Sequence, residues 1–412
     1  MSGPLTDDSV VALHPLHIGA VEDGAAEVGR TDTGVFVALP PEGVELVRLL
    51  GAGLPVGEVR RRFAERFGEP PDVADFLAAL QECGFVRAAP AEAAPGPAAG
   101  AGAPGVPLLS GLRPERLRWL LSRPMAVVYA AVWLAVPALL VAWPVLLPRP
   151  SDALLYHRVL PNALLVAVIA STLVMLHEFA HALAARARGC TGRFSVGRRL
   201  VFLVGQTDIS DVRTLPRRER YAPYLAGMTW DLVVVLVCFG CERAGWGGQL
   251  PRTVAYTIAL TFVYQFSVFM RTDVYYVIVN RLRLGNLMGD TQRYVSDLAR
   301  RAVRRAPLHD LSGVPERELR VVRWYSVYYL LGSTTVLGGF LLLSVPAVVD
   351  MVRLALDGMS AGPGAAGFWD GAGFLVLVVL QFGALGHVVL RDRARGGRAG
   401  TAGAPVVPAA PN

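Results

Sequence analysis

Hydrophobic and polar positions alternate over short distances in the first 87 residues, and long apolar runs replace this pattern from residue 108 onward. Several of the later runs exceed about 18 residues, the length at which a helix crosses the hydrocarbon core of a bilayer. The pattern therefore predicts a polytopic all-α membrane domain at 108–393 and a disordered C-terminal tail at 394–412. We expect about six transmembrane helices, at residues 125–147, 159–185, 221–241, 253–280, 325–345 and 372–390.

Residues 1–87 have the pattern of a small soluble α+β domain. Three short alternating segments, separated by turn residues, are expected to be strands, at 13–18, 26–29 and 35–39. Three amphipathic segments with proline, aspartate or glycine at their ends are expected to be helices, at 44–50, 56–67 and 73–83. Residues 88–107 are rich in Ala, Gly and Pro with one charge, Glu92, so they are predicted to be a flexible linker.

Composition agrees with a membrane protein, because 53% of the residues are hydrophobic and the mean hydropathy is +0.43. The net charge of +7 comes from arginine, since the chain has no lysine. These arginines lie at the ends of the predicted spans, which argues against nucleic-acid binding and sets the orientation. We place both termini in the cytoplasm and the protein in a bacterial inner (plasma) membrane. The N-terminus has no apolar segment typical of a cleavable signal peptide.

The sequence His177-Glu178-Phe179-Ala180-His181 lies inside the second predicted span. The H-E-x-x-H spacing puts two imidazoles one helical turn apart, where both can bind one Zn²⁺ with the glutamate beside it. An ordinary helix with incidental histidines is the alternative. It is disfavoured because His and Glu in hydrocarbon each cost a few kcal/mol.

A third metal ligand is expected from the depth of ionisable residues in the other spans. Asp273 lies roughly 12 Å from the same membrane face as His177 and His181, counted at 1.5 Å per residue. A site of two histidines and one aspartate favours Zn²⁺ over Mg²⁺ or Ca²⁺. The alternatives are an Arg271–Asp273 ion pair within the bundle, or Asp231 as the third ligand.

The segments HEFAHALAARARG and FMRTDVYY resemble the site-2 protease family of intramembrane zinc peptidases. The resemblance implies that His177, His181 and Asp273 bind zinc and that Glu178 is the general base, which activates the zinc-bound water for attack on the peptide bond. The family usually has Asp-Gly at the third ligand, preceded by Asn-Pro, whereas this chain has Asp273 followed by valine.

Two further segments are compared with the same family. Ala226 to Asp231 resembles an Ala-Gly-Pro motif followed by Asn, which places Asp231 near the substrate. Residues 199–210 are expected to form a membrane-associated β-hairpin with turns at Gly197 and Gly205 and a free edge for an extended substrate. A plain cytoplasmic hairpin is the alternative. Cys238 and Cys241 are expected to be packing residues, and His387 a structural or interfacial histidine.

The N-terminal pattern resembles PqqD-like domains, which are small winged-helix units that bind leader peptides of ribosomally made, post-translationally modified peptides. The resemblance rests on TDTGVFVALPPEG, LPVGEVRRRFAERFG and PDVADFLAALQECGFV, and it implies that a leader adds as a strand to the small sheet. A generic winged-helix domain is the alternative.

The sequence therefore favours an intramembrane zinc endopeptidase that removes the leader of a modified precursor peptide. Its expected partners are that peptide, the bilayer and the modifying enzymes or exporter of the same pathway. One alternative is a regulatory protease that cuts a membrane-anchored anti-sigma factor. The other is a non-catalytic receptor or export partner for peptides, which is disfavoured because it has no need of the complete motif.

Overall fold

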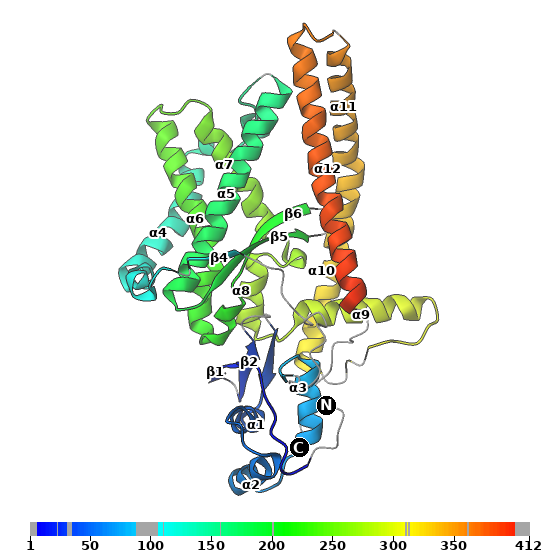
Figure 1. The fold of residues 1–412 in the computed structure, drawn as a ribbon. Coiled ribbons are helices and arrows are strands. Elements are labelled where there is room, and N and C mark those ends of the chain that lie inside the picture. Colours follow the sequence, from blue (N-terminus) through cyan, green and yellow to red (C-terminus); the bar gives the residue numbers. More distant parts are fainter. Residues whose placement is uncertain are drawn as a thin grey trace.

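The computed structural model describes residues 6–22, 24–30, 35–87, 106–109, 111–156, 158–199, 202–309, 311, 314–360 and 362–399. Most of these residues are helical, and Figure 1 shows a helical bundle with a small, separate N-terminal unit beneath it. Most of the predicted linker, at 88–105, and residues 400–412 of the predicted tail lie outside the described residues. Helix α12 (Ala366–Ala399) extends into the segment predicted as a tail.

The N-terminal unit contains a three-stranded antiparallel sheet in the order β1-β2-β3, followed by three helices. Its elements are β1 (His17–Glu22), β2 (Ala25–Arg30), β3 (Val35–Leu39), α1 (Pro41–Gly51), α2 (Val56–Phe67) and α3 (Val73–Glu82). The helices lie where the sequence predicts them. The first strand begins later than predicted, because Leu13 forms an isolated bridge with Val86 instead.

Local signals explain the ends of these helices. Pro55 is the N-cap of α2, and Gly68 ends the helix in the left-handed conformation at φ 91°. The side chain of Asp72 caps α3 by accepting hydrogen bonds from the N–H groups of Ala74 and Asp75. The helices pack on the sheet around a core of fully buried apolar side chains, including Val28, Leu50, Val56, Val59, Val73 and Phe85.

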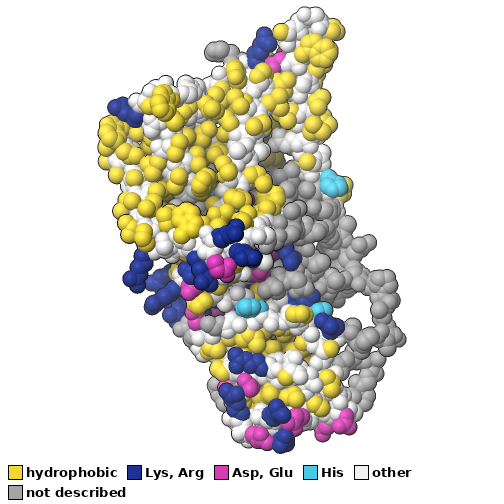
Figure 2. All heavy atoms as spheres, turned by 60° about the vertical axis from the view of Figure 1, so that its left-hand side comes forward, with side chains coloured by type: hydrophobic (Ala, Val, Ile, Leu, Met, Phe, Trp, Pro, Cys, Tyr) yellow, Lys and Arg dark blue, Asp and Glu magenta, His cyan; other side chains and the backbone are white. Residues whose placement is uncertain are grey.

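Five helices of the described residues are long and apolar enough to cross a membrane. Four of these candidate spans lie in single helices, which are α4 (Arg123–Ala142), α5 (Val159–Ala187), α6 (Arg217–Arg243) and α12. The fifth is a continuous helical run from Glu316 to Met359. It is built from α10 (Glu316–Gly339), a π-helical turn (Phe340–Ser344) and α11 (Val345–Met359). Hydrophobic side chains cover this part of the surface, and a band of charged side chains separates it from the N-terminal unit (Figure 2).

The prediction of six unbroken spans is wrong at the fourth one. Residues 253–280 form two helices, α7 (Leu250–Gln265) and α8 (Asp273–Leu282), joined by a short 3₁₀ turn at Val268–Met270. The apolar sequence continues across the break, so hydropathy does not reveal it. The break is stabilised by hydrogen bonds, because Gln265 accepts one from Asp273 N–H and one from the Thr272 hydroxyl.

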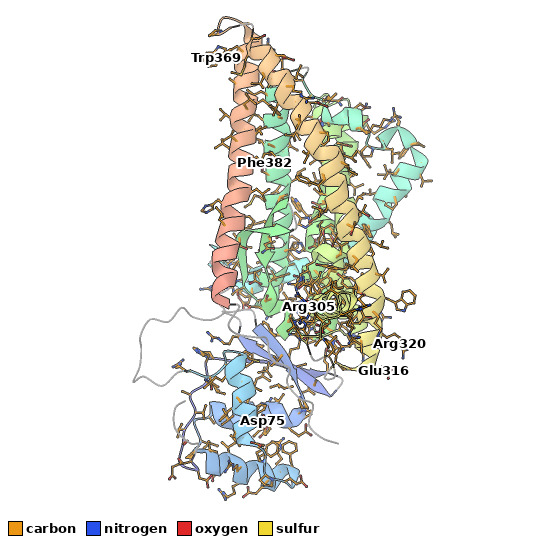
Figure 3. All side chains as sticks on the ribbon, turned by 90° about the vertical axis from the view of Figure 1, so that its right-hand side faces the viewer. Asp75, Arg305, Glu316, Arg320, Trp369 and Phe382 are labelled. Atoms are coloured by element: carbon orange, nitrogen blue, oxygen red, sulfur yellow. The ribbon has the colours of Figure 1, made fainter. Side chains whose placement is uncertain are left out.

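The long run from α10 to α11 and helix α12 lie side by side as a hairpin. Figure 3 shows Trp369 at the far tip of this hairpin, Phe382 midway along α12, and Arg305, Glu316 and Arg320 at the end near the N-terminal unit. An amphipathic helix, α9 (Leu287–Ala302), lies at the same end. Charged residues therefore mark the end of the bundle that faces the N-terminal unit.

A second antiparallel sheet, in the order β4-β5-β6, lies against α5 within the bundle (Figure 1). Its strands are β4 (Val106–Leu108), β5 (Gly192–Arg199) and β6 (Phe202–Asp208). The predicted hairpin is therefore present, but the turns expected at Gly197 and Gly205 are wrong, since both glycines lie inside the paired strands. The last two residues of the predicted linker belong to β4, an edge strand that tolerates proline.

Short 3₁₀ helices complete the chain. They are η2 (Pro114–Arg116), η3 (Arg118–Leu121), η4 (Pro144–Leu146), η5 (Pro150–Ala153) and η6 (Ser210–Thr214). The last of them connects β6 to α6 and carries the contact with the N-terminal unit.

Candidate metal centre

The predicted ligands meet where α5, α6 and the start of α8 pack together. Asp273 Oδ2 lies 2.9 Å from His177 Nε2 and 3.1 Å from His181 Nε2. The two Nε2 atoms are 3.2 Å apart. Both histidines are buried, so three ligand atoms from two separate segments converge in a place sheltered from solvent.

The other nitrogen of each imidazole is held by an acceptor. His177 Nδ1 lies 2.8 Å from Asp231 Oδ2, and His181 Nδ1 lies 2.7 Å from the backbone oxygen of Pro223. These acceptors require protonated Nδ1 atoms, which leaves the Nε2 lone pairs directed at each other. Asp231 thus contacts the far side of the His177 ring, and its carboxylate does not join the three ligand atoms that converge.

The donor set fits a divalent metal ion. Two neutral imidazole nitrogens and one carboxylate oxygen are ligands typical of Zn²⁺. A tetrahedral ion with bonds of about 2.0–2.2 Å separates its ligands by roughly 3.3–3.5 Å, slightly more than the distances found here. Converging lone pairs also repel one another unless a cation lies between them.

Gly227 of α6 makes room for the two imidazoles. A Cβ atom at this position would lie 2.4 Å from His177 Nε2 and 2.5 Å from His181 Nε2. Neither ring can retreat easily, because its Nδ1 atom is held on the opposite side. Any side chain at this position would therefore displace the ligands.

Gln265 connects the break in the fourth span to the metal centre. Its Oε1 accepts a hydrogen bond of 3.0 Å from Asp273 N–H, which fixes the orientation of the carboxamide. Its Nε2 consequently points toward the ligands and lies 3.4 Å from His177 Nε2. An amide nitrogen is a donor and not a metal ligand, so it is available to an oxygen atom bound beside the centre.

Glu178 is held by the edge strand of the second sheet. Its Oε2 accepts a hydrogen bond of 2.5 Å from Thr207 N–H in β6. Because hydrogen-bonding directions alternate along a strand, Gly205 presents its N–H and C=O on the same edge as Thr207. Gly205 also packs closely, since an added Cβ would lie 3.2 Å from Val174 of α5 and from the ring of Phe194.

A cavity of about 540 Å³ opens from these residues toward the N-terminal unit. Glu178, His181 and Asp273 line its inner end, and Ala25, Ala26, Glu27 and Ala38 of the N-terminal sheet line its outer end. Its volume is within the usual range for a ligand-binding pocket. Glu178 and the N-terminal sheet therefore line one cavity.

Arg271 also lines this cavity. Like Arg283, it adopts the left-handed conformation that a non-glycine residue rarely takes, at φ 56°. Among the described residues it forms no ion pair, so the predicted alternative of an Arg271–Asp273 pair is absent. His387 is exposed on α12, away from the three ligands, and Cys238 and Cys241 are free thiols in α6.

Three residues of the site, Gln265, Gly227 and Thr207, were not predicted from the sequence. Gln265 had a signal, since it is a polar residue inside an apolar run, eight residues before Asp273. Gly227 and Thr207 had none, because their roles come from contacts with other segments. Comparison of the chain with protein-family models, with curated proteins and with solved structures finds no match.

Proposed function

We propose that this chain is an intramembrane zinc endopeptidase that cleaves a ribosomally made, modified precursor peptide and removes its leader. The observation that carries the proposal is the convergence of His177, His181 and Asp273 at one end of a cavity that Glu178 also lines. Together with the resemblance to the site-2 protease family, these groups supply a ligand set, a base and room for a peptide. The bilayer is a cell membrane of a bacterium, with both termini in the cytoplasm.

The residues have separate tasks in this proposal. His177, His181 and Asp273 would hold Zn²⁺, which when bound polarises a scissile carbonyl and makes water nucleophilic near neutral pH. Glu178 takes a proton from the attacking water on its carboxylate and returns it to the leaving amine. The hydrogen bond from Thr207 keeps this carboxylate at the mouth of the centre.

Gln265 and Arg271 are placed to act on the substrate, and Asp231 acts through His177. Gln265 Nε2 donates a hydrogen bond to the carbonyl oxygen as negative charge develops on it. Asp231 orients His177 through its Nδ1 atom and so preserves the metal-binding tautomer. Arg271 binds a carbonyl or carboxylate group of the peptide in the cavity, since it has no ion pair of its own among the described residues.

The edge of β6 supplies a binding mode for an extended peptide. A helical substrate hides its carbonyl groups in hydrogen bonds, so it must open into a strand before hydrolysis. Gly205 offers an N–H and a C=O next to Glu178 for this purpose. The N-terminal unit, taken as a PqqD-like winged-helix domain, binds the leader and keeps the rest of the peptide near the cavity.

The test is cleavage of the precursor peptide encoded beside the gene, by purified protein in detergent. Wild type is compared with Glu178→Gln, with Glu65→Gln as a control at an exposed position of α2. We expect one Zn²⁺ per chain in all three proteins and cleavage by wild type and Glu65→Gln alone. Zinc without cleavage would contradict the choice of substrate, and a single-span membrane protein would then be tested. Absence of bound metal would overturn the site itself.

A further inference from the structure

The β1–β2 hairpin of the N-terminal unit contacts the membrane domain at the start of α6. This helix begins at Arg217 after Pro216, which makes no side-chain capping hydrogen bond. The cap comes from the other domain, because the Glu22 carboxylate accepts hydrogen bonds from Arg217 N–H at 3.1 and 3.3 Å. A carboxylate at this position also interacts favourably with the helix dipole.

Glu27 of β2 makes a second charged contact with the same region. Its carboxylate lies 3.2 Å from Arg213 Nε in η6 and 3.4 Å from Arg220 Nη1 in α6. The Arg220 side chain is only 10% exposed, so this contact is partly shielded from solvent. Burial alone would lower the pKa of Arg213, but the charge and hydrogen bond of Glu27 raise it above its ordinary value.

Backbone packing supports the same interface. A Cβ atom on Gly19 of β1 would lie 3.3 Å from the backbone oxygen of Thr214 and 3.7 Å from its Cα. Strand β1 therefore lies against η6 at a distance that leaves little room for a side chain. Such close approach, together with a cap supplied across the interface, is typical of a fixed contact and unusual for a domain on a free tether.

We propose that the N-terminal domain is a fixed wall of the substrate cavity and that the peptide reaches Glu178 through the space between β2 and β6. This proposal rests on the proposed function. The wall carries the small side chains of Ala25 and Ala38, and the opposite side carries the β6 residues Gln206 and Thr207. An extended peptide thus contacts both domains while it is cleaved, and the domain stays docked throughout turnover.

The first experiment locks the interface with a disulfide between Gly19→Cys and Thr214→Cys in the full-length protein. The two positions are neighbours, since an added Cβ at Gly19 would lie 3.7 Å from the Cα of Thr214. A protease site inserted in the predicted linker then reports the lock, because the two fragments stay together on a non-reducing gel. Gly19→Cys alone is the control for cross-linking by the native cysteines.

We expect the two fragments to remain linked after oxidation, and the oxidised protein to cleave the peptide within about threefold of the reduced one. Fragments that separate would overturn the docking. Cleavage that is lost on oxidation and restored by dithiothreitol would show that the N-terminal domain must undock from the membrane domain during turnover. That result would overturn the proposal of a fixed wall. The gel result does not depend on cleavage of the precursor peptide by this protein, so it is informative even if that peptide is not a substrate.

A second experiment loosens the interface and covers the case in which Gly19→Cys impairs folding. Glu22→Ala and Glu27→Ala together remove the cap and the ion pairs with Arg213, Arg217 and Arg220. Glu65→Ala is the control. We expect faster hydrogen exchange at Ser210–Thr214, and a KM about tenfold higher with little change in kcat. Unchanged exchange in the double variant would contradict a fixed wall.

Discussion

The two domains of this protein differ in their buried polar side chains, although both bury apolar ones. In residues 6–87 the buried positions are apolar, and none of the buried polar side chains of the described chain lies there. In the membrane domain Leu134, Val141 and Leu342 are 71%, 82% and 77% exposed, whereas His177 and His181 are 7% and 4% exposed. The N-terminal domain is stabilised by its core, and the membrane domain can use its interior for chemistry.

This difference follows from the solvent of each domain. Water drives apolar side chains together, so the core of a domain that folds in water is apolar and buries few charged groups. Lipid is as apolar as leucine, so membrane helices associate through close packing of small residues and polar contacts. Gly227 and Asp231 of α6 are examples of the two kinds of contact, and both touch the histidines.

Gly227→Ala should have the largest effect, because it fills the space of the ligands. The new methyl group would overlap both Nε2 atoms, and we expect loss of stoichiometric zinc without unfolding of the N-terminal domain. Zinc content of the purified protein is the measurement. Gly240→Ala is the matched control, since an added Cβ in the same helix has no neighbour there within 4 Å. Normal zinc in Gly227→Ala would contradict the site geometry.

Leu50→Ala should break the other domain and leave the metal centre intact. Leu50 is 1% exposed in the core, so its truncation should destabilise the N-terminal domain by about 2–5 kcal/mol. Urea denaturation followed by hydrogen exchange at 41–86 measures this, and zinc content is measured in parallel. Val21→Ala, at a position that is 54% exposed, is the control. A loss of zinc in Leu50→Ala would show that the metal centre depends on the folding of the N-terminal domain.

Gln265→Met should lower kcat by about a hundredfold, the usual cost of removing one donor to a developing oxyanion. Gln265→Glu retains the acceptor for Asp273 N–H but loses the amide donor, so it should lose activity as well. Thr272→Val removes a hydrogen bond of the helix break and leaves the Gln265 amide donor in place. The measurement is kcat and KM with zinc content determined on the same samples. If Thr272→Val lost as much kcat as Gln265→Met, Gln265 would act only by holding the break.

Cys190 should show the smallest effect, in its rate of alkylation. Burial, with a further contribution from the charge of Asp211, raises the pKa of this thiol to about 12. Its reactive thiolate is therefore scarce near pH 8, and the rate should increase about tenfold per pH unit up to that pKa. Mass spectrometry after maleimide treatment at several pH values is the measurement. Reaction as fast as at an exposed cysteine would show that the loop after α5 opens.

The parts of the fold that the sequence predicts are those with local signals. Helices α2 and α3 have proline, aspartate and glycine at their ends, and the ligand positions follow from spacing and depth in the apolar runs. The break at Gln265 was missed because hydropathy is continuous across it. The docking through Glu22 and Glu27 was also missed, since two glutamates in a soluble domain resemble any charged surface.

Helix α7 has a further consequence because of its length. Its 16 residues extend about 24 Å at 1.5 Å per residue, less than the hydrocarbon thickness of roughly 30 Å. The chain continues as α8, so the break at Val268–Met270 lies within the thickness of the bilayer. Irregular backbone at that depth needs protein or water around it, and the cavity that Arg271 and Asp273 line reaches the break. The break is thus a place where water can enter the membrane domain, which the proposed hydrolysis requires.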